Sequence, residues 1–161
     1  MREINLTQSA VALVDDDDYE RLSKYNWFFA RGYAYRTGIG ANGKRTSISM
    51  HREIVDIRPG YECDHINGNR FDNRKANLRQ ATHTQNLANQ KAQVCCTSRF
   101  KGVSRDRTRW QAQIAINNKS QYLGRFIRET DAALAYNDAA SNLFGEFARL
   151  NVIPEDTADG Y

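Results

Sequence analysis

The chain has 161 residues, of which 40% are hydrophobic and 26% are charged. This composition predicts a globular protein of one domain or two small ones, and it excludes an intrinsically disordered chain. No apolar run approaches the length of a membrane span, and we expect no signal peptide and no membrane partner.

The net charge of +4 is distributed unevenly along the chain. Residues 1–40 carry −1 and residues 41–95 carry +4, whereas residues 96–127 carry +6 and residues 128–161 carry −5. Two adjacent basic segments between acidic ends suit a protein that lays one face on a phosphate backbone. An ordinary solvated surface is the alternative interpretation of so mild a net charge.

The three cysteines are Cys63, Cys95 and Cys96, an odd number without paired spacing. We expect all three to be reduced thiols in a cytoplasmic protein. No Cys-x-x-Cys pairs flank His65, so a structural zinc site is not expected.

Residues 1–50 are predicted to be rich in β-structure. Partial alternation of apolar residues covers Ile4 to Val14, and a second strand-like region carries aromatic residues expected in the core. These aromatic residues are Trp27, Phe28, Phe29, Tyr33 and Tyr35. The acidic run Asp15–Asp18 has a metal site as one interpretation. The favoured one is the N-cap and first turn of a helix, where carboxylates meet the helix dipole.

Residues 38–43 match the pattern G-x-G-x-x-G. A dinucleotide site requires this pattern to open a helix in a βαβ unit. Here Asn42-Gly43 indicates a hairpin turn instead, and residues 44–50 alternate like a further strand. We therefore reject a dinucleotide site.

The segment from Glu62 to Asn86 organises the rest of the chain. Asp64 and His65 close a short β-like segment, a loop dense in Asn, Gly and Asp follows, and residues 78–81 form another short run. Thr82 and Gln85 then predict a capping box at the start of a helix that we expect to continue to Ala92. A hard cation needs oxygen ligands from separate elements, with a water-activating base beside it.

This segment resembles the HNH homing-type endonucleases, whose active site is a ββα-metal hairpin. The matching residues are Asp64-His65, Asn69-Arg70, Asp72-Asn73-Arg74, Asn77-Leu78-Arg79 and Asn86. The resemblance implies that Asp64 and Asn86 bind Mg or Mn and that His65 is the general base. It also implies that Asn77 holds the hairpin and orients the His65 ring. The expected phosphate clamps are Arg70, Arg74 and Arg79. The residues before the hairpin resemble the strand-rich N-terminal part of many phage proteins of this family.

Two further histidines leave alternatives open. His51 is interpreted as a structural residue packed beside the hairpin, with a direct catalytic role as the alternative. His83 lies three residues before Asn86, so both can share a helix face. His83 is therefore the alternative metal ligand, with Asn86 as a bystander.

A different pattern begins at Phe100. Residues 110–117 alternate between apolar and polar, Asn117-Asn118-Lys119 predicts a turn, and residues 122–126 form a third strand. A helix is expected from about Thr130, with small alanines on its buried face and a stop at Gly145. Tyr136 is interpreted as a core residue, with a phosphate ligand as the alternative.

This second pattern resembles the plant ethylene-response-factor (Apetala-type) DNA-binding domain. The matching residues are Lys101-Gly102-Val103, Trp110, Ala112, Ile114, Tyr122-Leu123-Gly124, Phe126, Ala132-Ala133, Ala135-Tyr136 and Leu150-Asn151. The resemblance implies a three-stranded antiparallel sheet that enters the major groove, backed by one helix. The candidate DNA contacts are Lys101, Arg105, Arg107, Arg109, Gln111, Gln113, Ser120, Tyr122 and Arg125.

The sequence therefore predicts an α+β protein. We expect an HNH nuclease domain at 1–94 with its motif at 62–92, a linker at 95–99, an ethylene-response-factor-like domain at 100–151, and a loose acidic tail at 152–161. The expected function is metal-dependent cleavage of duplex DNA at a specific site. One active site cuts one strand, so a monomer should nick and a double-strand break would need a dimer.

The family also implies a phage-encoded protein in the cytoplasm of a bacterial host. The alternatives are a DNA-binding regulator with an inactive HNH module and a protein directed to RNA. The flat β-ribbon disfavours RNA, because the major groove of A-form RNA is deep and narrow.

Overall fold

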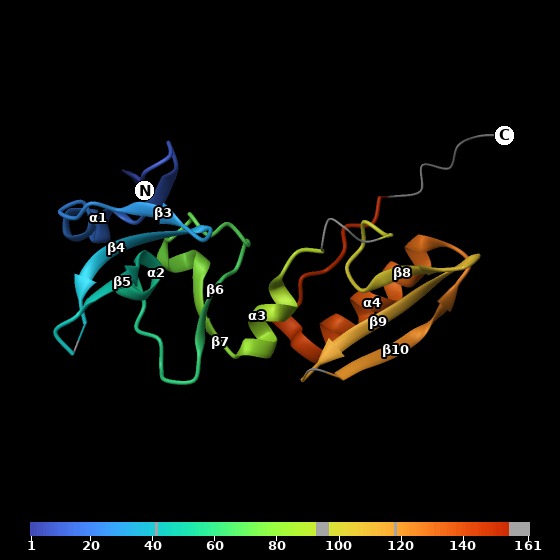
Figure 1. The fold of residues 1–161 in the computed structure, drawn as a ribbon. Coiled ribbons are helices and arrows are strands. Elements are labelled where there is room, and N and C mark those ends of the chain that lie inside the picture. The colour runs from blue at the N-terminus through green and yellow to red at the C-terminus, as the bar shows by residue number, and fades with distance from the viewer. Residues whose placement is uncertain (41, 93–96, 118, 155–161) are drawn as a thin grey trace. The chain divides into compact units, whose positions relative to one another are not determined.

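The computed structural model describes residues 1–40, 42–92, 97–117 and 119–154, and the chain divides into two compact units (Figure 1). Unit 1 comprises Met1–Asn86 and unit 2 comprises Leu87–Tyr161. Cys95, Cys96, Asn118 of the expected turn and residues 155–161 of the expected tail lie outside the described residues. Among the helices that the structure describes, none has both the length and the apolar character that a membrane crossing requires.

Unit 1 begins with an antiparallel hairpin of β1 (Arg2–Asn5) and β2 (Val11–Val14). Helix α1 (Asp16–Leu22) follows, and its first turn holds Asp16, Asp17 and Asp18, as predicted from the acidic run. The carboxylate of Asp15, at the N-cap position, accepts a 2.7 Å hydrogen bond from the backbone N–H of Lys75. The acidic run therefore starts a helix and also forms a hydrogen bond to the segment around Lys75, which is distant in sequence.

The second sheet of unit 1 joins β3 (Phe28–Ala30), β4 (Tyr33–Ile39) and β5 (Arg45–Ser49) in that order. Asn42-Gly43 lies in the hairpin turn between β4 and β5, as predicted, and Gly43 has a φ of 72°. The expected strand at residues 44–50 ends one residue early. Met50 instead starts α2 (Met50–Ile54), which carries its side chain into the core, where it is fully buried.

Apolar residues from the hairpin, α1, β4 and α2 form the core of unit 1. They are Ile4, Leu6, Ala12, Val14, Leu22, Trp27, Ala34 and Met50. The indole N–H of Trp27 donates a 2.8 Å hydrogen bond to the carbonyl of Leu22, so its polar atom is satisfied inside this core. Burying a side chain the size of Leu22 or Met50 stabilises the fold by about 1.5–3 kcal/mol.

The predicted hairpin of unit 1 is formed by β6 (Glu62–His65) and β7 (Leu78–Ala81), joined by a loop that includes the short 3₁₀ turn η1 (Lys75–Asn77). Helix α3 (His83–Asn89) follows. The capping box is confirmed, because Thr82 N donates to Gln85 Oε1 at 2.8 Å and Gln85 N donates to Thr82 Oγ1 at 3.2 Å. The expectation that the helix continues to Ala92 is wrong, since α3 ends at Asn89.

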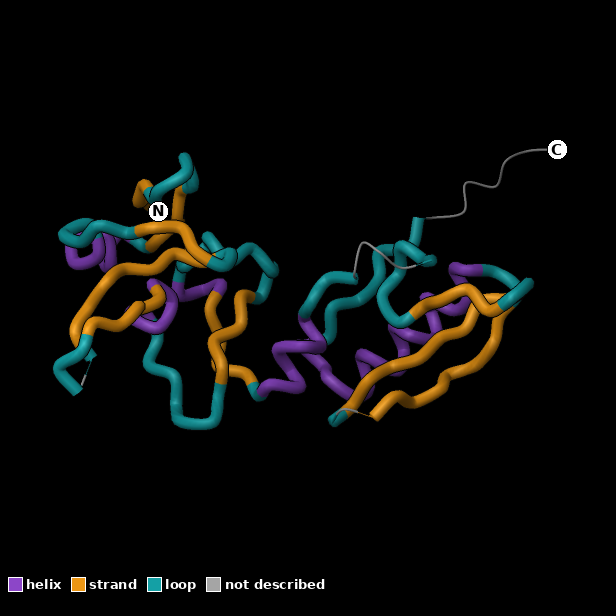
Figure 2. Tube along the Cα trace, in the orientation of Figure 1, coloured by secondary structure: helices purple, strands orange, loops and turns teal. Residues whose placement is uncertain are grey.

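Unit 2 contains an antiparallel sheet in the order β10-β9-β8, packed on one helix. Its strands are β8 (Val103–Asp106), β9 (Arg109–Ile116) and β10 (Lys119–Phe126), and Figures 1 and 2 show α4 (Glu129–Phe144) along one face of the sheet. The buried residues of α4 are Ala132, Ala133, Tyr136 and Ala140. Helix α4 stops at Gly145, which has a φ of 52° and begins the short 3₁₀ turn η2 (Gly145–Phe147). This arrangement confirms the predicted α+β fold class.

Gly102 and Tyr136 fix how closely α4 approaches the sheet. Gly102 has a φ of 74°, and a Cβ added there would lie 2.1 Å from Tyr136 Cδ2 and 2.5 Å from Gln113 O. Only glycine has room at this position. Tyr136 is buried, and burial raises the pKa of its hydroxyl to about 12, so its interpretation as a core residue is confirmed.

The segments that precede and follow the sheet and α4 in the sequence contact the rest of unit 2. Thr97 and Ser98, placed in the expected linker, accept hydrogen bonds from the backbone N–H groups of Arg105 and Phe100 at 2.9 and 3.0 Å. The Asn151 side chain pairs with both backbone groups of Lys101, at 2.7 and 3.1 Å. Ile153, in the expected loose tail, packs against the core.

Candidate active site

The Asp64-His65 pair lies at the end of β6, where successive side chains point to opposite faces of the hairpin. Both residues are only 4% exposed. Asp64 lies opposite Arg79 in the strand register, and Arg79 Nε donates to Asp64 Oδ2 at 2.9 Å. The hairpin therefore holds a buried carboxylate directly before a buried imidazole.

The ring of His65 is surrounded by polar and aromatic groups. Its Nε2 lies 3.3 Å from Asn73 Oδ1, and its ring centroid lies 6.0 Å from that of Tyr33 and 5.4 Å from that of His51. Burial lowers the pKa of the His65 imidazole below its usual range, an effect that the Asn73 hydrogen bond opposes. A neutral imidazole is able to accept a proton, so this environment keeps the base form present at neutral pH.

His51 packs beside His65 in the same aromatic group. It is buried, its Nε2 lies 3.3 Å from Ser49 Oγ, and its ring lies 5.2 Å from that of Tyr33 between centroids. Burial, with the nearby His65 ring and Arg52 as smaller causes, lowers the pKa of His51 to about 4. These surroundings are those of the structural histidine interpreted from the sequence.

Asn77 closes the loop between β6 and β7. Its Nδ2 donates to the Asp72 carbonyl at 2.8 Å, and its Oδ1 accepts from the Asn67 backbone N–H at 3.0 Å. The amide bonded to the His65 ring is that of Asn73, which is 1% exposed. Sequence reasoning included Asn73 in the motif but gave it no role. The signal that could have pointed to its contact with His65 was its position within the matched residues 72–74.

The three arginines expected to clamp phosphate have different partners. Arg74 donates to both carboxylate oxygens of buried Asp72, at 2.7 and 2.6 Å, and this hydrogen bonding lowers the pKa of Asp72. Arg79 is paired with Asp64. Arg70 is exposed, and its guanidinium lies 4.6 Å from the centroid of the Tyr33 ring.

The first turns of α3 meet β6 through Glu62. Glu62 Oε1 lies 2.8 Å from His83 Nδ1, and Glu62 Oε2 accepts a hydrogen bond from Asn86 Nδ2. Hydrogen bonding by Asn86, followed by that of His83, lowers the pKa of Glu62 against the effect of burial. Sequence reasoning missed Glu62, although alternation along β6 puts it on the same face as Asp64.

The donor set of the site suits a hard divalent cation. Asp64 offers a carboxylate, and Asn86 offers its Oδ1 because its Nδ2 is engaged by Glu62. Carboxylate and amide oxygens are ligands that Mg²⁺ and Mn²⁺ accept. No cluster of three or more His, Cys, Asp or Glu side chains able to hold a metal is found within residues 1–40, 42–92, 97–117 and 119–154.

The sheet of unit 2 exposes a polar face on the side opposite α4. Gln113 lies opposite Tyr122 and Gln111 lies opposite Arg125 across β9 and β10. Gln113, Tyr122 and Arg125 are exposed, and Arg125 forms a 3.0 Å ion pair with Asp106. The remaining exposed candidates are Arg105, Arg107, Arg109 and Ser120.

Lys101 does not share this face. Its ammonium donates to the carbonyls of Leu87, Ala88 and Gln90 at 3.1, 2.5 and 2.8 Å. These carbonyls belong to the last turn of α3 and to the residue after it, where no further helical turn supplies N–H donors. The Lys101 side chain therefore caps the C-terminal end of α3.

Comparison with known proteins bears on the family of this chain. Residues 56–88 match the family model described as HNH endonuclease. An uncharacterised HNH endonuclease of Acanthamoeba polyphaga mimivirus is 31% identical over 150 residues, covering 88% of this chain and 75% of that protein. The dehydration-responsive element-binding protein 2E of Arabidopsis thaliana is 40% identical over 74 residues, covering 38% of this chain and 30% of the plant protein. No solved structure showed a significant match.

Proposed function

This chain belongs to the HNH endonuclease family, and we propose that it is a metal-dependent endonuclease that nicks one strand of duplex DNA at a preferred site. The observation that carries the proposal is the buried Asp64-His65 pair at the end of β6, with a hydrogen-bonded imidazole and Asn86 presented by the adjoining helix. The proposed active residues come from the β6–β7 hairpin and from the helix that follows it in the chain.

His65 acts as the general base. Its neutral imidazole removes a proton from the water that attacks the phosphorus atom, and Asn73 keeps the ring in place. Because burial lowers the pKa of His65, the acid limb of the pH–rate profile should lie below about 6.5, the ordinary histidine value. The imidazole gains its proton as pH falls through that limb, and activity is lost.

Asp64 and Asn86 are the residues that would hold a magnesium or manganese ion. When bound, such an ion stabilises the negative charge that develops on the phosphate oxygens. Glu62 holds the Asn86 amide so that Oδ1 remains available, and His83 in turn contacts Glu62. We therefore assign His83 to support of this group and Asn86 to the ligand position.

Arg70 is the best-placed phosphate clamp of the three arginines. It is exposed and stacked on Tyr33, next to the His65 ring, whereas Arg74 and Arg79 bind carboxylates within the fold. Arginine on an aromatic face keeps its outer N–H groups available for a phosphate.

Site preference is assigned to the sheet of unit 2. A β-ribbon fits the major groove of B-DNA, and Gln and Arg side chains pair with adenine and guanine edges there. Gln111, Gln113, Tyr122 and Arg125 lie on the polar side of β9 and β10. The similarity to a plant protein named for binding a DNA element supports this assignment.

The test is nicking of supercoiled plasmid that carries the native flanking locus. We expect open circles with Mg²⁺, none with EDTA, and a loss of about 10²–10⁴-fold in rate for His65→Ala. Circular dichroism of His65→Ala at the assay temperature controls for folding. Equal nicking by a folded His65→Ala protein would contradict the assigned base.

A DNA-binding regulator is the second candidate. The observation that favours it is the Arg79–Asp64 pair, which gives one oxygen of the expected ligand a partner inside the fold. Tight duplex binding without scission under Mg²⁺ or Mn²⁺ would establish this alternative and exclude the nuclease.

A further inference from the structure

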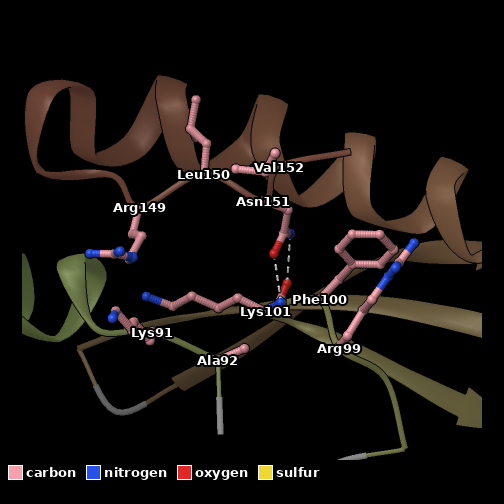
Figure 3. Close-up of a pocket in the computed structure, with 9 residues that line it drawn as sticks. All are labelled: Lys91, Ala92, Arg99, Phe100, Lys101, Arg149, Leu150, Asn151 and Val152. Carbon is pink, nitrogen blue, oxygen red and sulfur yellow. Dashed lines mark hydrogen bonds between the residues drawn. The ribbon is translucent and has the colours of Figure 1, made fainter. Parts of the chain in front are cut away.

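A cavity of about 370 Å³ lies within unit 2, remote in sequence from the Asp64-His65 pair (Figure 3). It is lined by residues that follow α3, by residues that precede β8 and by the segment after η2. The lining residues are Lys91, Ala92, Arg99, Phe100, Lys101, Arg149, Leu150, Asn151 and Val152.

The lining is cationic. Four of the nine residues are lysine or arginine, and the nine, all within the described part of the chain, include no carboxylate. Figure 3 shows the charged ends of Lys91, Lys101 and Arg149 gathered on the side of the cavity next to the green α3 ribbon, whereas Arg99 extends past Phe100. The guanidinium of Arg99 lies 4.8 Å from the centroid of the Phe100 ring.

The walls of the cavity are held by hydrogen bonds. Asn151 binds both backbone groups of Lys101, and its own backbone N–H and carbonyl pair with the Asn137 side chain at 2.7 and 2.9 Å. The backbone N–H of Arg149 donates to the Ala88 carbonyl at 3.2 Å. Arg149 is therefore attached to backbone that is held by hydrogen bonds on both sides of it.

The grouped cations repel one another. Burial, with the charge of Arg149 as a second cause, lowers the pKa of Lys101 to about 8. The Lys101 ammonium donates to three carbonyls and supplies charge at the cavity wall. The charged ends of Lys91 and Arg149 lie beside it in Figure 3 and are the groups that would contact a ligand. A ligand with several anionic oxygens would offset the positive charge of this wall and accept hydrogen bonds from Lys91 and Arg149.

We propose that this cavity binds a phosphate of the DNA backbone, through Lys91 and Arg149, at a site separate from the base-reading face of the sheet. The inference rests on the proposed function for its partner, duplex DNA. A phosphate contact of this kind adds affinity and fixes the register of the protein on the duplex without reading sequence.

The experiment measures the salt dependence of binding to a short duplex of unrelated sequence, for the full chain and for Arg149→Gln and Lys91→Gln. Each lost phosphate contact should lower the slope of log K against log salt by about 0.9. Arg128→Gln is the matched control, because it removes one charge from the same unit outside the cavity, at the start of α4. We expect its slope to equal that of the wild type.

A second arm separates backbone phosphate from a free anion. Pyrophosphate is titrated into the wild-type protein while the backbone amide signals of Lys101 and Asn151 are followed by NMR. Lower slopes for both variants, with the control unchanged, support the proposal. Unchanged slopes in folded variants overturn it, even where pyrophosphate binds, because the cavity would then serve a free anion. A wild-type chain that fails to bind duplex DNA contradicts the proposed function itself.

Discussion

The β6–β7 hairpin and the β8–β10 sheet are both small antiparallel structures, yet they treat polar residues in opposite ways. The hairpin buries Asp64, His65, Asp72 and Asn73, and each has hydrogen-bonding partners. The sheet buries an apolar face against α4 and exposes Gln113, Tyr122 and Arg125. A buried network holds side chains in fixed geometry, as chemistry requires, whereas an exposed polar face on a rigid backing can adjust to a ligand surface.

Gly102→Ala should have the largest effect, because it should disrupt the packing of α4 on the β8–β10 sheet. The added Cβ would overlap the Tyr136 ring and the Gln113 carbonyl, at a φ that side chains rarely adopt. Strain and overpacking together should destabilise unit 2 by about 2–5 kcal/mol. Thermal unfolding should show a lowered transition with unit 1 retained, and an unchanged melting profile would contradict the packing described. Gly60→Ala is the matched control, because it has a positive φ but no heavy atom within 4 Å of an added Cβ.

The pH dependence of folding stability should show the titration of buried His51, which lies in α2 and packs beside the hairpin residue His65. His51 has a pKa of about 4 in the fold, and about 6.5 is expected in the unfolded chain. The unfolded state therefore binds more protons between these values, so stability should be complete above about pH 6.5 and fall by about 3 kcal/mol as pH approaches 4. Urea unfolding at a series of pH values measures this slope, and His51→Phe should flatten it. An equal slope in the variant would assign the titration to another group.

Glu62→Ala tests whether the network around α3 positions the metal ligand. Loss of the hydrogen bond to Asn86 should weaken Mn²⁺ binding by about 10–100-fold, as is typical of groups that orient ligands. Glu62→Gln keeps an acceptor oxygen and should retain most of the affinity. The electron paramagnetic resonance signal of free Mn²⁺ gives the dissociation constants. Equal loss in both variants would make Glu62 itself a ligand.

Arg125→Gln should have the smallest effect, and it tests whether the exposed polar face of the sheet contacts DNA bases. The side chain lies opposite Gln111 and is paired with Asp106, so its removal costs little folding stability. Affinity for the preferred DNA site should fall by about tenfold or less, with weaker discrimination at one base pair. Competition between the preferred and an unrelated duplex measures this change. Arg128→Gln again serves as the control for charge.

Much of the fold was predictable because its signals are local. The capping box at Thr82 and Gln85, the turn at Asn42-Gly43 and the stop at Gly145 each depend on residues close in sequence. The alternation of apolar and polar residues in β9 was also visible in the sequence, and it predicted a strand with one apolar face. Local chemistry thus accounts for the elements and the fold class.

The partners inside the site were less predictable because they depend on how loops close. Asn73 contacts His65 only because the loop folds back across the hairpin, and Glu62 meets Asn86 only because α3 packs beside β6. The C-terminal end of α3 is capped by Lys101, which is eleven residues beyond Gln90. Neither spacing nor composition encodes such contacts.

The loop between β6 and β7 is joined to the beginning of the chain. Leu13 of β2 donates to the Phe71 carbonyl and accepts from the Asn73 N–H, both at 2.8 Å, and Asp15 accepts from Lys75. Asn73, which contacts the His65 ring, is thereby fixed by a residue sixty positions earlier. A minimal fragment cut to the family motif at residues 56–88 would lose this brace. Engineers who graft the hairpin onto another DNA-binding scaffold therefore need to carry residues 1–15 with it, as a structural part of the nuclease.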